Sequence, residues 1–332
     1  MRPPFLSNPP IKTYQSNAYA LGAFLALGDG AYGILDNNFI TLASVSNIKS
    51  AFRPITFLPF IGPDTFSVFG LGSLLSFKAF NRMELSRAIA ASLHRGFLVR
   101  LGVDEYYIPD RWAYRNKHKI HDVLVTAVAH NESSLELIGY CADRRYRPSS
   151  CSLDELSEGY FAAVEKTGRR GFLAFKAELP QPVVIDIAAI KCQLEHFLQS
   201  RRPVSTVSPS TQRTAEPNIY GLAVFDACKS YLSNLTPTEW LDRRVFSLPA
   251  EHSEMMLRRT LRLESLFSVK IDRTAAEGAI QISSRLKLLS LMPEERRSTV
   301  VLVEMTKLFV RLKEVSQNAA ETLLRAIEKG AS

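Results

Sequence analysis

Residues 97–110 read FLVRLGVDEYYIPD, and this stretch decides the fold. Its first half is apolar and rich in β-forming residues, so it predicts a strand that ends at an acidic and aromatic turn. Two of the six histidines, His118 and His121, follow this turn and directly precede a second apolar run at 123–129. Titratable side chains at strand ends can carry chemistry while the core stays apolar. We therefore expect the functional site at this turn.

The composition is typical of a globular protein. The chain has 332 residues, of which 46% are hydrophobic and 22% are charged, and this length predicts about two domains. The net charge is +8, but the basic residues are scattered and form no run of the roughly five to eight typical of nucleic-acid patches. The most apolar segment, residues 55–80, is broken by prolines and glycines. We expect neither a nucleic-acid partner nor a membrane span.

The cysteines indicate a reducing compartment. No pair of the four has C-x-x-C spacing, which argues against a thioredoxin-like motif and against a zinc site. The first residues, Met1 to Pro4, do not begin an apolar signal sequence, so we expect a cytoplasmic protein. No strand–GxGxxG–helix unit or Walker lysine is present, and we expect no cofactor.

Helices come first in the N-terminal half, and an antiparallel sheet follows. The segments that predict helices are 17–27 with Ser16 as N-cap, 35–45, 82–95 and 152–164, the last with capping-box character. The segments that predict strands are 97–101, 123–128, 135–140 and 171–176, with a polar turn at 130–134.

The C-terminal half predicts helices almost throughout. The predicted helices are 186–199, 219–234, 237–243, 251–268, 273–290 and 294–329. Between the first two lies a polar segment with three prolines, at 201–217, which indicates a linker or exposed loop. The predicted fold is thus α+β, with an N-terminal domain at 1–200 and a helical domain at 218–332. The helical domain is also the expected surface for a homodimer.

The two histidines admit a catalytic and a structural interpretation. Neither has a third ligand at zinc-site spacing, so we expect no metal. His121 at a strand end can act as a general base if a carboxylate orients it, and Asp143 follows the neighbouring strand across the predicted hairpin. The alternative is an ordinary strand-end histidine beside an ordinary loop aspartate. The pattern alone favours this alternative.

A family resemblance changes that balance. The run GVDEYYIP at 102–109, with Tyr114, His118, His121 and the strand at 122–128, resembles the N-terminal domain of the BtrH-like family of butirosin-type biosynthesis. Residues 218–222, NIYGL, resemble the start of the family's helical region. The resemblance implies a papain-like N-terminal domain and acyl transfer from an acyl- or peptidyl-carrier protein in antibiotic biosynthesis.

The sequence departs from this family at the nucleophile. The family places a cysteine at the N-terminus of the first helix, where the helix dipole lowers a thiol's pKa. Here Asn17 takes that position with Ser16 beside it, and no cysteine occurs before Cys141. The resemblance assigns catalysis to His121 and Asp143. The residues expected to bind substrate are Gln15, Tyr19, Asp104, Tyr106, Tyr107 and His118.

An asparagine amide is not a nucleophile, so the expected chemistry divides into three interpretations. In the first, the chain lacks catalysis and binds a carrier protein or synthetase. In the second, His121 is a general base and Asn17 is a hydrogen-bond donor. In the third, Ser16 replaces the cysteine in a Ser-His-Asp arrangement. We favour an acyltransferase- or cyclase-like enzyme of secondary metabolism, with the inactive binding protein as the alternative; cysteine-peptidase activity is not expected.

Overall fold

The computed structural model describes residues 3–58, 61–65, 70–128, 134–203 and 217–330. The chain divides into two compact units, and each is discontinuous in sequence. Unit 1 comprises Met1–Ala31 and Ile61–Pro182, and unit 2 comprises Tyr32–Phe60 and Val183–Ser332. Residues 32–60 thus group with the C-terminal helices.

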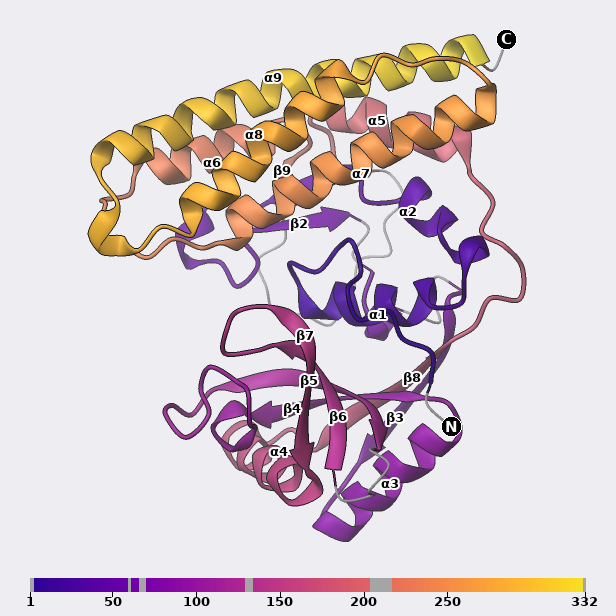
Figure 1. Cartoon of the computed structure of the whole chain (residues 1–332), viewed down its shortest axis with the longest axis vertical. Coiled ribbons are helices and arrows are strands. Elements are labelled where there is room, and N and C mark those ends of the chain that lie inside the picture. Colours follow the sequence, from indigo (N-terminus) through magenta and orange to yellow (C-terminus); the bar gives the residue numbers. More distant parts are fainter. Residues whose placement is uncertain (1–2, 59–60, 66–69, 129–133, 204–216, 331–332) are drawn as a thin grey trace. The chain divides into compact units, whose positions relative to one another are not determined.

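Unit 1 is built on a six-stranded antiparallel sheet with the order β3-β8-β4-β5-β6-β7 (Figure 1). The strands are β3 (Gly72–Lys78), β4 (Leu98–Asp104), β5 (Ile120–Val128), β6 (Ser134–Tyr140), β7 (Tyr146–Ser152) and β8 (Gly171–Ala177). The opening stretch supplies β4 in the middle of this sheet, and β5 pairs with it so that Val103 lies opposite His121.

Helices cover both faces of this sheet. Figure 1 shows α3 (Arg82–His94) and α4 (Leu153–Thr167) against one face and α1 (Gln15–Leu25) against the other. The short 3-10 turns of unit 1 are η1 (Asp29–Ala31), η3 (Pro63–Thr65) and η4 (Glu105–Tyr107). Alternate residues of β4 are buried in the core shared with α3 and α4, as the two-residue period of a strand requires.

Local signals predicted α3 and α4 well. Asn81 caps α3 by accepting a hydrogen bond from the Glu84 backbone N–H. Ser152 and Glu155 form the complete capping box at the start of α4. These side chains satisfy backbone donors that the first turn of a helix leaves free. The capping depends only on residues close in sequence and not on tertiary packing.

Three details of unit 1 differ from the sequence prediction or lie outside what the structure describes. Helix α1 begins at Gln15 after Tyr14, so Ser16 lies in the first turn and is not the N-cap. Strand β7 was not predicted, because its polar sequence YRPSSCS contains Pro148, which sheets tolerate at an edge. Most of the predicted turn at 130–134 falls on residues 129–133, outside the described residues.

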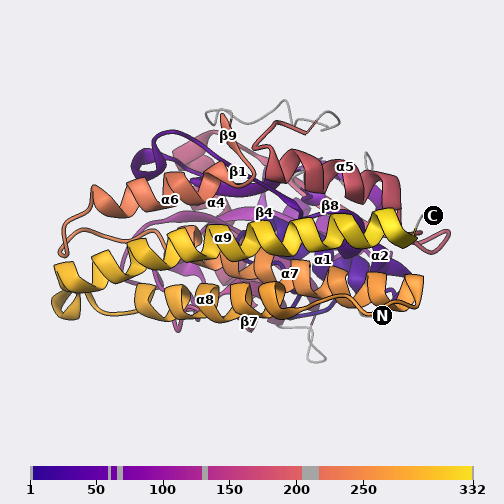
Figure 2. The same ribbon diagram turned by 90° about the horizontal axis from the view of Figure 1, so that it is seen from above.

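Unit 2 combines long helices with a small antiparallel sheet of order β2-β1-β9. Its helices are α2 (Gly33–Asn37), α5 (Ile187–Leu198), α6 (Ala223–Ser233), α7 (Arg244–Phe267), α8 (Thr274–Ser290) and α9 (Thr299–Gly330), and its strands are β1 (Thr41–Ser44), β2 (Ile55–Leu58) and β9 (Ile219–Tyr220), with 3-10 turns η2 (Ile48–Ser50) and η5 (Glu294–Arg296). Figure 2 shows α7, α8 and α9 running side by side. The predicted α+β class and helical C-terminal region are confirmed.

The predicted helix at 35–45 is wrong. The chain leaves α2 at Asn37 and forms β1, which pairs with β2 on one side and with β9 on the other. Residues 237–243 are not helical either, and α6 starts later than predicted because β9 precedes it. The predicted linker at 201–217 lies largely outside the described residues, which omit 204–216. Within the described chain, none of the helices has the length and apolar character that crossing a bilayer requires.

A buried histidine of α7 makes the stability of unit 2 depend on pH. His252 is fully buried beside Phe57 and Phe197, and its Nε2–H donates to the Ile40 carbonyl at 3.0 Å. Its Nδ1 is buried without a partner among the described residues. Burial, helped by the positive charge of Arg259, lowers the pKa of His252 to about 3.

We expect H252Q to flatten the acid dependence of folding. The unfolded chain binds a proton on His252 below its ordinary pKa of about 6.5, whereas the folded chain does not until about pH 3. The stabilisation from a neutral His252 is therefore complete above pH 6.5 and is lost, by up to about 1.4 kcal/mol per pH unit, as the pH falls toward 3. Urea unfolding between pH 7 and 4 measures this slope. The exposed His94 provides the control H94Q, and an unchanged slope in H252Q would contradict the expectation.

Candidate functional site

The centre of the site is a histidine–carboxylate pair at the end of two neighbouring strands. His121 lies on β5, and its Nδ1 is 3.0 Å from Oε1 of Glu105, the residue that follows β4. The Glu105 side chain is only 5% exposed, whereas that of His121 is 39% exposed. No described residue hydrogen bonds to Nε2 of His121. Nε2 of His121 is thus free at the surface, and the buried Glu105 carboxylate fixes the orientation of the ring through Nδ1.

Glu105 is held in its charged form. Its burial would raise the pKa of the carboxyl group, but the hydrogen bond from His121 and the positive charges of Lys119 and Arg111 outweigh that effect and lower the pKa. An ionised carboxylate on Nδ1 fixes the tautomer and orientation of an imidazole and stabilises the imidazolium that forms when Nε2 takes a proton. Sequence reasoning missed Glu105, although it lies inside the stretch that decides the fold.

Asp143, predicted as the orienting carboxylate, lies in a different environment. It accepts hydrogen bonds from the Arg145 backbone N–H and from Nε of Arg147, both at 3.0 Å. The expected hydrogen bond between Asp143 and His121 is not formed in the described part of the chain. The reason is the tight turn between β6 and β7, closed by the bond from the Cys141 N–H to the Arg145 carbonyl, which directs Asp143 toward β7.

Helix α1 starts beside the strand that carries His121. The Gln15 amide, oriented to satisfy both of its ends, donates to the Asp122 carbonyl at 3.0 Å and accepts from the Tyr140 N–H at 2.9 Å. It thereby continues the ladder between β5 and β6 beyond the last strand pair, Leu124 with Ile138. The start of α1 and residue 122 are joined by this contact, which the sequence could not indicate because it depends on tertiary packing.

The next two residues of α1 have different surroundings. Asn17 is almost fully buried, and its Nδ2 donates to the Ile61 carbonyl at 2.7 Å, so its amide anchors the helix. Ser16 is half-buried, and no group of the described chain hydrogen bonds to its hydroxyl. Of the two, Ser16 has the side chain that is free to meet a ligand.

Tyr19 is a buried support for this region. Its hydroxyl lies 3.2 Å from the Asp122 carbonyl and 3.3 Å from the Ile138 carbonyl, and it also contacts Gln15. Burial raises the pKa of Tyr19 far above its ordinary value, so the hydroxyl stays protonated. Tyr19 therefore links α1 to β5 and β6 from inside the protein.

Arg111 places buried hydrogen-bond donors close to Gln15 and Tyr140. The residue is 3% exposed, and its Nη1 donates to the Tyr140 carbonyl at 2.9 Å. Its Nε and Nη2, like the hydroxyl of Tyr146, are buried without a partner among the described residues. A side chain at Gly139 would come within 3.1 Å of Nη1 and 3.0 Å of the Gln15 amide, so glycine leaves them the space. Such donors favour oxygen atoms that carry negative charge.

Asp104 organises the loop that leads to His121. All four acceptor positions of its buried carboxylate are occupied, by His118, Lys166 and the backbone N–H groups of Tyr106 and Lys119. Burial alone would raise the pKa of Asp104, but these hydrogen bonds, led by those of Lys166 and His118, lower it. Asp104 thus fixes the loop and has no acceptor position left for a ligand.

The aromatic residues of this loop form a partly exposed stack. The ring of Tyr106 stacks on His118 with centroids 4.5 Å apart, and Tyr107 meets Tyr106 edge-on at 5.1 Å. His118 is 52% exposed. These three predicted binding residues therefore lie together on the loop, and His118 is tied to Asp104 and not to His121.

The arrangement can move a proton through the exposed Nε2 of His121. Within the described residues, no three His, Cys, Asp or Glu side chains gather in a way that could hold a metal ion. The chemistry available is that of His121, oriented by Glu105, and of the half-buried Ser16 hydroxyl. Compared with known proteins, the chain matches no protein-family model and no curated protein.

Proposed function

We propose that the protein is an acyltransferase-type enzyme of natural-product biosynthesis in which His121 is the general base and Glu105 orients it. The acyl group is delivered as a thioester on an acyl- or peptidyl-carrier protein, and the reaction takes place in the cytoplasm. A papain-like arrangement of α1 against the sheet belongs to this proposal. The single observation that carries it is the 3.0 Å contact between Nδ1 of His121 and the buried Glu105.

The chemical step follows from the free nitrogen of His121. Nε2 accepts a proton from an amine as the amine nitrogen attacks the thioester carbonyl, and the C–N bond forms. The carbon–sulfur bond then breaks, and the proton passes to the leaving thiolate. The step consumes no oxidant or reductant and needs no cysteine. Hydrogen-bond donors that stabilise the negative charge developing on the carbonyl oxygen would add to the rate.

We expect H121A to lose most of this activity. An acyl N-acetylcysteamine thioester, a mimic of the carrier-bound group, is mixed with amines, and thiol release is followed colorimetrically. A general base contributes about 10²- to 10⁴-fold, so H121A should be slower by this factor. The partly exposed His196 of α5 gives the matched control H196A, which should keep the wild-type rate. A wild-type rate in H121A would overturn the proposal.

Two further outcomes separate the remaining alternatives. If Ser16 forms a covalent intermediate, a fluorophosphonate will label it, peptide mass spectrometry will find the adduct, and S16A will not react. If the wild-type protein binds the thioester or a carrier protein but releases thiol no faster than buffer, the non-catalytic binding protein replaces the enzyme.

A further inference from the structure

Unit 1 contains a second feature with the properties of a ligand site, at the other end of α1. A pocket of about 290 Å³ opens between the end of α1, the end of α3 and the end of β8. Its apolar wall includes Ala23 and Leu27, and Leu98 at the start of β4. Ala23 lies eight residues along the chain from Gln15, a rise of about 12 Å in a helix. The pocket is therefore separate from the His121 site.

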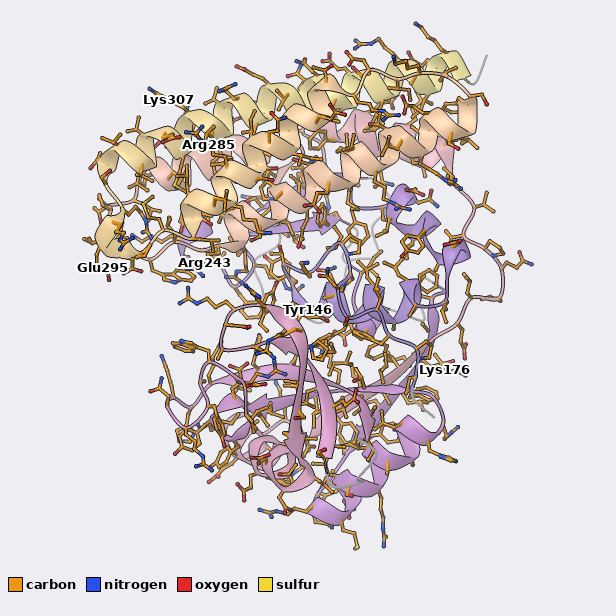
Figure 3. The ribbon with its side chains drawn as sticks, viewed as in Figure 1. Tyr146, Lys176, Arg243, Arg285, Glu295 and Lys307 are labelled. Atoms are coloured by element: carbon orange, nitrogen blue, oxygen red, sulfur yellow. The ribbon has the colours of Figure 1, made fainter. Side chains whose placement is uncertain are left out.

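Basic side chains surround this apolar wall. His94, Arg95 and Lys176 all line the pocket, and Figure 3 shows Lys176 toward the end of β8. Lys176 forms a half-exposed ion pair with Glu178, whose carboxylate is 3.9 Å from its Nζ. Such a pair gives little stabilisation, so Lys176 can exchange it for a ligand.

The backbone at the end of α3 comes close to the Lys176 side chain. Gly96 turns the chain from α3 into β4 with φ +81°, a conformation that side-chain-bearing residues seldom adopt. A Cβ at this position would make an ordinary van der Waals contact with Cε of Lys176, at 3.7 Å, so the two groups border the same pocket. The Arg95 guanidinium lies over the Phe97 ring, 5.9 Å from its centroid, which restrains its position at the rim.

From these features we infer that the pocket binds an amphiphilic anion, a short aliphatic chain that ends in a carboxylate or a phosphate. The chain lies against Ala23, Leu27 and Leu98, and the anionic group meets Arg95 and Lys176. The pocket is near the lower end of the size range of ligand sites, which suits one short chain. Each methylene buried in it raises affinity by about fourfold.

Calorimetric titration of the full-length protein tests this with octanoate, octyl phosphate, octanol and butyrate. Octanoate or octyl phosphate should bind saturably, and octanol at least tenfold more weakly because it lacks the charge. Butyrate should be weaker than octanoate by about fourfold for each methylene that the pocket buries. The tighter of the two octyl anions identifies the head group. Equal binding of octanol and octanoate would overturn the inference.

Variants locate the binding within the pocket. K176Q and R95Q should each weaken octanoate binding about fivefold, and L27W should block it by filling the apolar space. R87Q removes an exposed charge from the same helix, α3, and is the matched control that should bind as the wild type does. If K176Q, R95Q and L27W all bind as R87Q does, the anion lies elsewhere. H121A should bind octanoate normally, so failure of the proposed catalysis and failure of this site are distinguishable.

Discussion

E105Q should lower the rate of thiol release by about 10²- to 10⁴-fold while the protein stays folded. A neutral amide at position 105 keeps the size of the side chain but cannot stabilise an imidazolium, and it no longer selects the Nδ1–H tautomer of His121. In serine proteases the comparable change from Asp to Asn costs about 10⁴-fold. Steady-state assays with the thioester and amine measure the effect, and circular dichroism checks the fold.

D143N is the decisive comparison, because the same chemical change is made on the carboxylate that the family resemblance assigned to His121. Asp143 is bound to Arg145 and Arg147 at an exposed turn. We expect D143N to retain the wild-type rate within about twofold. A large loss in D143N together with a normal rate in E105Q would return the orienting role to Asp143 and contradict the assignment of Glu105.

R259M should destabilise unit 2 by about 3–5 kcal/mol, the largest stability change that we expect from one substitution. Arg259 is fully buried on α7, and its guanidinium donates to the carbonyls of Leu35, Asp36 and Asn38 at the end of α2. Methionine fills a similar volume but leaves these carbonyls without their donors. An unpaired buried acceptor costs about 1–3 kcal/mol.

Charge adds to this effect. The buried carboxylate of Asp36 attracts Arg259, although Arg258 and Arg262 lie closest to it, at 3.2 and 3.9 Å. Burial lowers the pKa of Arg259 only to about 10, so it is charged at neutral pH. R262M, at a 54% exposed side chain, is the control and should cost less than about 1 kcal/mol. Urea unfolding measures both variants, and equal effects would contradict the buried network.

The parts of the fold that follow local rules were predictable, and the parts that depend on distant pairing were not. The capping residues of α3 and α4 act within four residues, so both helices could be placed. Residues 41–44 form β1, which pairs with β2 on one side and with the distant β9 on the other. Nothing in the sequence near these residues indicates this pairing. The helical pattern at 35–45 therefore gave the wrong structure.

The candidate site divides in the same way. The stretch at 97–110 and His121 could be found because strand ends and titratable residues are visible in the sequence. The partner of His121 depends on the register between β4 and β5, in which Val103 meets His121 and brings Glu105 within reach. Arg111 and Gln15 meet near Tyr140 only after α1 packs on the sheet, so no spacing in the sequence could assign them.

The division of each unit into two chain segments has a consequence for synthesis on the ribosome. Strand β1 pairs with β2 soon after both are made, but its other edge must wait for β9, because Ala43 pairs with Tyr220. At about 5–20 residues per second, making the intervening chain takes on the order of 10–35 s. During that time the nascent protein carries an open strand edge, which can pair with other chains. The order of translation thus leaves unit 2 exposed to aggregation through this edge until β9 has been made.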